Sequence, residues 1–260
     1  MPIFDDEGRK IYYEVAGSGS ALLLINGIAG DTRQWAPLVG ELQNSFQTII
    51  YDMRCSGKSS KPDEPFGISD LAGEAHRLLR HLGHKSSCVL GFSMGGMVAM
   101  SLACRYPESV GKLFLVATAP SASRPHPLSS RILKMFRRTD VSSSLFTEVY
   151  ESIFGPEYKK KVSAKDFIDF RTSDENPQPA FAYLRQLEAL ESGDLFDEVE
   201  RIKAPTVVIT GEEDAVVSPA NSEWLAGRLP GASLFKLKGI GHMVPAEATG
   251  ELARILISNR

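Results

Sequence analysis

The sequence predicts an α/β protein built on a mostly parallel β-sheet that is covered by helices on both faces. Apolar segments rich in β-branched residues alternate with helical segments along most of the 260 residues. Several of these segments are continuously apolar, which is typical of strands buried on both faces. Clusters of glycine, proline and asparagine separate one segment from the next.

The individual elements follow from local patterns, taken in chain order. Strands are expected at residues 11–15, 21–25, 48–51, 88–90, 113–116, 206–209 and 233–237. Helices are expected at 35–42, 69–82, 94–106, 222–229 and 246–257, where apolar side chains recur on one stripe. Gly83 and Pro107 fit the ends of the second and third of these helices.

One long segment interrupts the alternation of strands and helices. Residues 120–194 contain no convincing strand, and they include a basic amphipathic segment at 132–137. An insertion of this length between two strands of a compact sheet is expected to have its own structure and a role. We therefore predict a core formed by residues 1–119 and 195–260, and a helical cap, or lid, formed by residues 120–194 over the active site.

Composition limits the classes of partner and the compartment. Apolar residues make up 43% of the chain and charged residues 23%, with a net charge of −3, so neither nucleic acid nor an anionic membrane is expected as a partner. Three cysteines are too few for a disulfide framework, and no signal peptide is evident at the N-terminus. We expect a cytoplasmic protein.

A candidate nucleophile lies in the segment Gly91-Phe92-Ser93-Met94-Gly95, which matches the pattern Gly-x-Ser-x-Gly. The pattern alone is weak, but here it directly follows a predicted strand and opens a predicted helix. That strand–turn–helix setting is what a nucleophile elbow requires. The glycines remove Cβ atoms that would block so tight a turn. Ser93 is therefore predicted to be a catalytic nucleophile, against the alternative of an idle serine in a structural turn.

A nucleophilic serine needs a base, and the base needs an orienting acid. His242 is the histidine that follows the last predicted strand, in a glycine-rich loop before the final helix. Asp214 follows the strand at 206–209, again in a loop at a carboxyl end. These residues appear in the order serine, acid, histidine that this kind of fold uses. Glu213 is the alternative acid, and a turn residue or helix cap is the alternative role for Asp214.

The other histidines suggest simpler roles. Their positions are His76, His81, His84 and His126. The first three lie on or near one helix, where two of them can complement the helix dipole. Their spacing would suit a metal, but no cysteine or carboxylate cluster accompanies them, so no metal site and no cofactor are predicted. His126 lies in the cap, as a solvated loop residue or a substrate contact.

An oxyanion hole would complete the site. One donor is expected to be the backbone N–H of Met94, at the start of the helix that follows the nucleophile. The second is expected to be the N–H of Ile28, in the loop after the strand at 21–25. The alternative is that Gly27 and Gly30 only shape a turn in this loop.

Taken together, these motifs resemble the α/β-hydrolase superfamily. They are Asn26-Gly27 with Trp35 downstream, residues 52–59, the elbow at 91–96, residues 211–214, and Gly241-His242. The resemblance implies an eight-stranded, mostly parallel sheet with a helical cap, and it extends to small bacterial carboxylesterases and enol-lactonases. Two positions depart from the family pattern. Asn26 replaces the usual histidine, and Cys55 replaces a glycine, either as a packed loop residue or as an accessible thiol near the site.

The function predicted from these residues is hydrolysis of a small-molecule carboxylic ester or lactone. Carbon–carbon bond hydrolysis or perhydrolysis with the same three residues is one alternative, and a small-molecule sensor that signals through the lid is another. Lid side chains are predicted to line an apolar substrate pocket, or else to form the packing of the lid itself; they are Met135, Phe136, Phe146, Phe181 and Tyr183. The sequence leaves the oligomeric state open.

Overall fold

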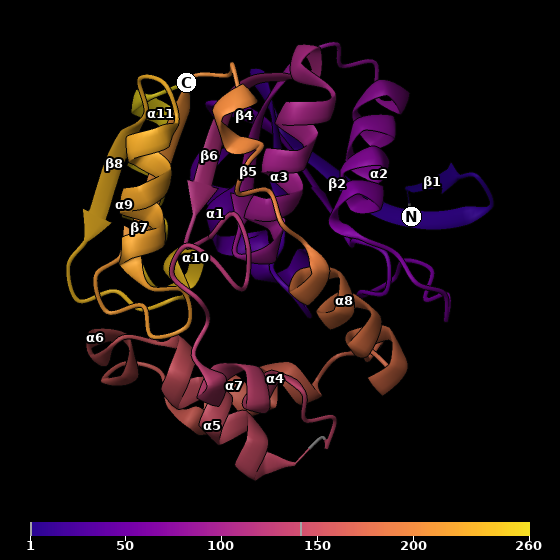
Figure 1. Ribbon diagram of the computed structural model, residues 1–260. Coiled ribbons are helices and arrows are strands. Elements are labelled where there is room, and N and C mark those ends of the chain that lie inside the picture. The colour runs from indigo at the N-terminus through magenta and orange to yellow at the C-terminus, as the bar shows by residue number, and fades with distance from the viewer. Residues whose placement is uncertain (1, 141) are drawn as a thin grey trace.

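A computed structural model describes residues 2–140 and 142–260 of the chain. Within these residues, eight strands form one sheet in the order β1-β2-β4-β3-β5-β6-β7-β8 (Figure 1). The strands are β1 (Ile3–Asp6), β2 (Arg9–Gly17), β3 (Ser20–Ile25), β4 (Phe46–Tyr51), β5 (Ser87–Phe92), β6 (Val110–Val116), β7 (Thr206–Gly211) and β8 (Ser233–Leu237). The pairs β1–β2 and β2–β4 are antiparallel and the other pairs are parallel. The predicted eight-stranded, mostly parallel fold is confirmed.

Strand β1 has no counterpart in the elements expected from sequence. Its four residues, Ile3–Asp6, end in two acids and therefore carry no clear strand pattern. It forms because Glu7 and Gly8 both adopt positive φ, 54° and 86°, in the two-residue turn that joins it to β2. Turns of this kind match the twist of an antiparallel hairpin.

Helices cover both faces of the sheet, and strand β3 shows why its sequence is continuously apolar. Leu23 and Ile25 pack into the core shared with α2 (Ile68–His81), α3 (Met94–Arg105) and α9 (Pro219–Arg228). Leu22 and Leu24 point to the other face and pack with α1 (Ala36–Leu42) and α11 (Thr249–Ser258). Alternate side chains of one strand thus enter two separate cores.

The helix expected at residues 246–257 is divided into two. A short helix α10 (Val244–Glu247) precedes α11, and Ala248 between them adopts φ −130° and ψ 37°, outside the helical region. This break turns the chain just after the loop that carries His242. A 3-10 turn at Thr32–Trp35 likewise precedes α1.

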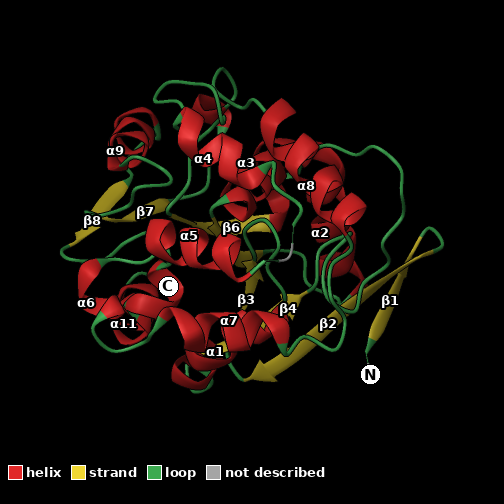
Figure 2. Cartoon of the chain, turned by 90° about the horizontal axis from the view of Figure 1, so that it is seen from below, coloured by secondary structure: helices red, strands yellow, loops and turns green. Residues whose placement is uncertain are grey.

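The segment between β6 and β7 consists of helices. They are α4 (Ser130–Phe136), α5 (Ser143–Ile153), α6 (Pro156–Lys159), α7 (Ala164–Thr172) and α8 (Ala180–Ser192). The two ends of the segment meet in an antiparallel bridge between Ser121 and Asp194. In Figure 1 the arrowheads of β6 and β8 point toward α5, α6 and α7, and Figure 2 shows α5 and α7 in front of the sheet when it is viewed from that side.

The register of the central strands brings two loops together. Ile25 at the end of β3 pairs with Gly91 on β5, and Phe92 at the end of β5 pairs with Val116 on β6. The loops that follow β3 and β5 therefore begin side by side, at the carboxyl ends of these strands, which face the helices of residues 120–194. Among the described residues, no helix has the length and apolar content needed to cross a membrane.

Candidate active site

Ser93 occupies a strained turn between β5 and α3. Its φ of 54° and ψ of −121° lie in a region that residues with a Cβ atom rarely adopt. This tight turn brings the start of α3 very close to the end of β3. A Cβ atom on Gly95 would lie 2.3 Å from the backbone oxygen of Ile25, so only glycine fits there. The backbone N–H of Ser93 donates to the oxygen of Val116 at 2.9 Å, which fixes the turn against β6.

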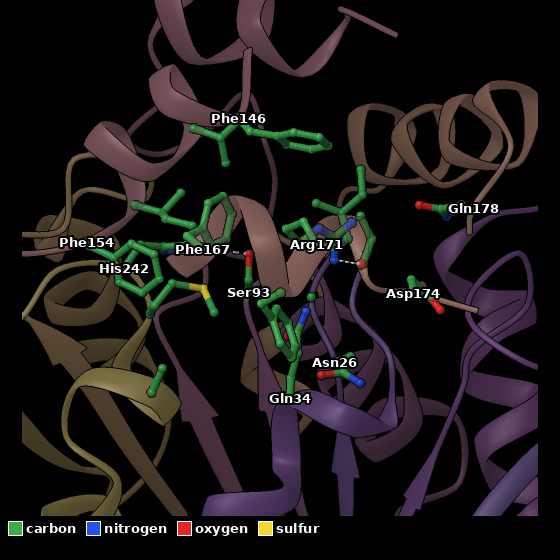
Figure 3. Close-up of a pocket in the computed structure, with 18 of the residues that line it drawn as sticks. Asn26, Gln34, Ser93, Phe146, Phe154, Phe167, Arg171, Asp174, Gln178 and His242 are labelled. Carbon is green, nitrogen blue, oxygen red and sulfur yellow. Dashed lines mark hydrogen bonds between the residues drawn. The ribbon is translucent and has the colours of Figure 1, made fainter. Parts of the chain in front are cut away.

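His242 faces Ser93 from the loop between β8 and α10. The ring Nε2 lies 3.0 Å from the Ser93 hydroxyl oxygen, and the histidine is 5% exposed (Figure 3). The backbone N–H of His242 donates at 2.8 Å to the oxygen of Ile153, at the end of α5. The loop that carries this histidine is therefore held by a helix of the segment 120–194, which the sequence did not indicate.

Asp214 completes a hydrogen-bonded chain of three side chains. Its Oδ2 lies 2.8 Å from His242 Nδ1, and its Oδ1 accepts the backbone N–H groups of Val216 and Val217, both at 2.9 Å. With Nδ1–H donated to the carboxylate, Nε2 is left to accept the proton of the serine hydroxyl. Glu213, the alternative acid, is exposed, and in the described part of the chain the hydrogen-bond partner of the ring Nδ1 is Asp214. The structure thus brings Ser93, His242 and Asp214 together.

The two backbone groups expected to bind an oxyanion flank Ser93. Met94 is the first residue of α3, where N–H groups have no partner within the helix. Gly27 packs against Ser93 so closely that a Cβ atom on it would lie 3.1 Å from the Ser93 Cβ. Ile28 follows, and among the described residues its N–H donates no hydrogen bond. Both groups are thus available to a ligand at Ser93.

A cavity of about 520 Å³ opens above these residues, between the sheet and the cap helices. Ser93 and His242 form part of its wall, and aromatic side chains from the cap form another part, as Figure 3 shows for Phe146, Phe154 and Phe167. Of the five cap residues predicted to contact substrate, four line this cavity, namely Met135, Phe136, Phe146 and Tyr183.

The prediction for Phe181 differs from the structure. This side chain does not contribute to the cavity wall, and it is 39% exposed. Helix α8 buries Ala182 and Gln186 instead. Because successive residues of a helix are rotated by about 100°, the neighbouring Phe181 points away from this buried face. Aromatic character marked Phe181 as a pocket residue, but the phase of the helix turns it toward solvent.

Glu247 is a site residue that sequence reasoning missed. Its carboxylate accepts the backbone N–H groups of Gly155 at 2.8 Å, Gly241 at 3.0 Å and Met243 at 3.1 Å. Two of these donors flank His242, so Glu247 shapes the loop that carries this histidine. Burial raises the pKa of the Glu247 carboxyl above its ordinary value. In the sequence, an acid on the last helices resembles any solvated surface residue, which is why no pattern indicated its role.

The two departures from the family pattern have clear structural roles. Asn26 is buried, and its amide nitrogen donates to the backbone oxygen of Asp31 at 2.9 Å, which closes the loop after β3. Cys55 has a φ of 71°, which explains why a glycine is usual at this position. The Cys55 thiol is fully buried, lies outside the cavity wall, and has its pKa raised to about 11 by burial. It is a packed loop residue.

The histidines near α2 have ordinary partners. His76 Nδ1 lies 2.9 Å from the hydroxyl of Ser109, and its ring stacks on Tyr106 with 4.0 Å between centroids. His81 packs on the ring of Phe4. These contacts give both side chains structural roles in packing around α2.

Comparisons with known proteins agree with this architecture. Lipase 1 of Psychrobacter immobilis is 28% identical over 95% of this chain and 79% of its own length. The 3-oxoadipate enol-lactonase 2 of Acinetobacter baylyi is 26% identical over 92% of this chain and 91% of its own. The crystal structure of an enol-lactonase from Burkholderia xenovorans shares the fold with a TM-score of 0.84, at 24% identity, over 99% of this chain and 98% of that one.

A profile of the α/β hydrolase fold matches residues 20–249, which is most of the chain. That range contains β3, the elbow, the cap helices, and the loops that carry Asp214 and His242. The protein belongs to the α/β hydrolase fold family.

Proposed function

We propose that the protein is a serine hydrolase that cleaves a small carboxylic ester or lactone through an acyl-enzyme intermediate. The observation that carries this proposal is the continuous chain of hydrogen bonds from Ser93 to His242 to Asp214, open to a cavity at the serine end. Membership of the α/β hydrolase fold family supports hydrolase chemistry, and the relatives compared above include a lipase and an enol-lactonase.

In the first half of the proposed reaction, the Ser93 oxygen attacks the substrate carbonyl carbon while its proton passes to His242 Nε2. Asp214 holds the ring in the required tautomer and stabilises the imidazolium. The carbonyl oxygen becomes negative and accepts the N–H groups of Ile28 and Met94. When the carbon–oxygen bond to the leaving group breaks, the leaving oxygen takes the proton from His242, and the acyl group remains on Ser93.

The second half repeats these steps with water. His242 removes a proton from the water molecule as its oxygen attacks the acyl carbon. The bond to Ser93 then breaks, and the serine oxygen recovers the proton from His242. The product is a carboxylic acid, and the enzyme returns to its starting state. The apolar cap side chains provide a dry wall for the acyl group, which strengthens the electrostatic interactions at the reacting atoms.

The proposal is tested with a panel of 4-nitrophenyl esters and γ- and δ-lactones, assayed with wild type and with Ser93→Ala. Wild type is expected to hydrolyse at least one ester or lactone, and Ser93→Ala is expected to lose at least about 10³-fold of that rate. Equal rates for the two proteins would contradict the proposal, because the activity would then not pass through Ser93.

A further inference from the structure

One charged side chain of the cavity wall lacks a partner of opposite charge. Arg171, on α7, lines the same cavity as Ser93, and both are labelled in Figure 3. Its Nη1 donates to the backbone oxygen of Ala29 at 3.0 Å. In the described part of the chain, no other acceptor bonds its guanidinium, and no carboxylate oxygen lies within 4.0 Å of it. Four of the five N–H groups of this guanidinium are therefore free for a ligand.

The acids near Arg171 are already occupied by another cation. Arg33 binds Asp31 at 2.8 Å and Asp174 at 3.1 Å. Arg138, a further cation of the cavity wall, binds Asp140 at 2.9 Å and Glu148 at 2.8 Å. Among the lining arginines of residues 2–140 and 142–260, Arg171 alone has no carboxylate partner.

Burying a guanidinium without a carboxylate partner in a cavity wall costs free energy, and a bound anion would offset that cost. Burial lowers the pKa of Arg171, although arginine stays charged at neutral pH. Much of the surrounding wall is apolar, and the nearby charges act in opposite directions, since Asp31 and Asp174 favour the charged form of Arg171 while Arg33 opposes it. A carboxylate matches a guanidinium in charge and shape, because two parallel N–H donors can reach its two oxygens.

We propose that Arg171 binds a carboxylate of the substrate, so that the ester or lactone cleaved at Ser93 carries a second, anionic carboxylate group. This inference rests on the proposed function. Arg171 bonds Ala29, the residue after Ile28, which puts the guanidinium beside the loop that binds the oxyanion. In the view of Figure 3, Arg171 and His242 lie on opposite sides of Ser93.

The test compares pairs of 4-nitrophenyl esters whose acyl chains end either in a carboxylate or in the isosteric carboxamide, with two, three or four methylene groups. Wild type is expected to favour the carboxylate member of the best pair by about 10- to 100-fold in kcat/KM, the range for a charged hydrogen-bonded contact. Arg171→Gln keeps an N–H donor for Ala29 but removes the charge. It is expected to raise KM for the carboxylate ester and to leave the carboxamide ester nearly unchanged.

The control is Arg137→Gln, an exposed arginine of the cap outside the cavity wall, which changes the net charge equally. It should keep the preference for the carboxylate. Two outcomes would overturn the inference. One is a wild-type enzyme that does not prefer any carboxylate ester. The other is an Arg171→Gln variant that slows both members of a pair equally, because Arg171 would then serve only to hold Ala29.

A binding measurement separates failure of this inference from failure of the proposed function. Succinate, glutarate and adipate are titrated calorimetrically into Ser93→Ala and into Ser93→Ala/Arg171→Gln. Binding of one dicarboxylate that is lost in the double variant supports the carboxylate site even when wild type hydrolyses no ester. Absence of binding to Ser93→Ala, or equal binding to both proteins, contradicts the site even when esters are hydrolysed.

Discussion

The side-chain oxygen of Gln186 accepts a hydrogen bond at 3.0 Å from the backbone N–H of Ala29, although the two residues are 157 positions apart in the chain. Gln186 is fully buried on α8, and its amide nitrogen donates to the oxygen of Arg54 and the hydroxyl of Ser56, both at 2.8 Å. Ala29 has a φ of 57°, a conformation that needs support from its surroundings. A cap helix thus holds the loop that presents Ile28.

We predict that Gln186→Leu lowers kcat for a neutral ester by about 10-fold or more while KM changes little. The loop that carries the oxyanion donor loses its support, and loss of one such donor costs on the order of 10² to 10³ in rate. Steady-state kinetics check this, with Glu188→Gln, an exposed neighbour on the same helix, as the control. A variant that loses thermal stability but keeps kcat would show that Gln186 is purely structural.

The identity of the acid is tested by two matched substitutions in one loop. Asp214→Asn is expected to reduce kcat by about 10³- to 10⁴-fold, because an amide cannot stabilise the imidazolium and favours the wrong tautomer of His242. Glu213→Gln is expected to keep nearly full activity, because its side chain is exposed. Both variants are compared by kcat at neutral pH, and the opposite ranking would reassign the acid.

We predict that the difference in stability between wild type and Glu247→Gln depends on pH. Because burial raises its pKa above the ordinary 4.5, the folded protein keeps this proton to a higher pH than the unfolded chain does. Its contribution to the free energy of unfolding is therefore fully present below about pH 4.5 and is lost as the pH rises through the raised pKa. Glu247→Gln lacks this titration.

Urea unfolding of wild type and Glu247→Gln at a series of pH values measures that contribution as a difference. The stability of wild type relative to the variant should fall as the pH rises from 4.5 through the raised pKa of the carboxyl. A relative stability that grows over this range would mean that the carboxyl pKa is lowered in the folded protein.

We predict that the buried Cys55 thiol resists alkylation in the native protein. Its pKa is raised to about 11, so almost none of it is thiolate at pH 8, and its sulfur is fully covered. Native protein treated with iodoacetamide should remain unmodified at this residue, as read by peptide mass spectrometry, whereas protein unfolded in urea should react. Rapid labelling of native Cys55 would indicate an accessible thiol.

How far the sequence predicted the structure depended on the range of the interactions. Every strand except β1, the elbow around Ser93 and the order of Asp214 and His242 were predictable, because they follow from local patterns along the chain. Arg171, Gln186 and Glu247 were not, because each acts through a contact with a residue far away in sequence. Phe181 was misplaced for a related reason, since a single aromatic residue does not fix the phase of its helix.

Labelling with a fluorophosphonate shows whether Ser93 is a nucleophile that His242 activates. Native protein is treated with the reagent, digested and mapped by mass spectrometry, alongside His242→Ala and Ser93→Ala. We expect one phosphonylated residue, Ser93, with labelling slowed by orders of magnitude in His242→Ala and absent in Ser93→Ala. Failure of Ser93 to react, or equal labelling in His242→Ala, would contradict this expectation.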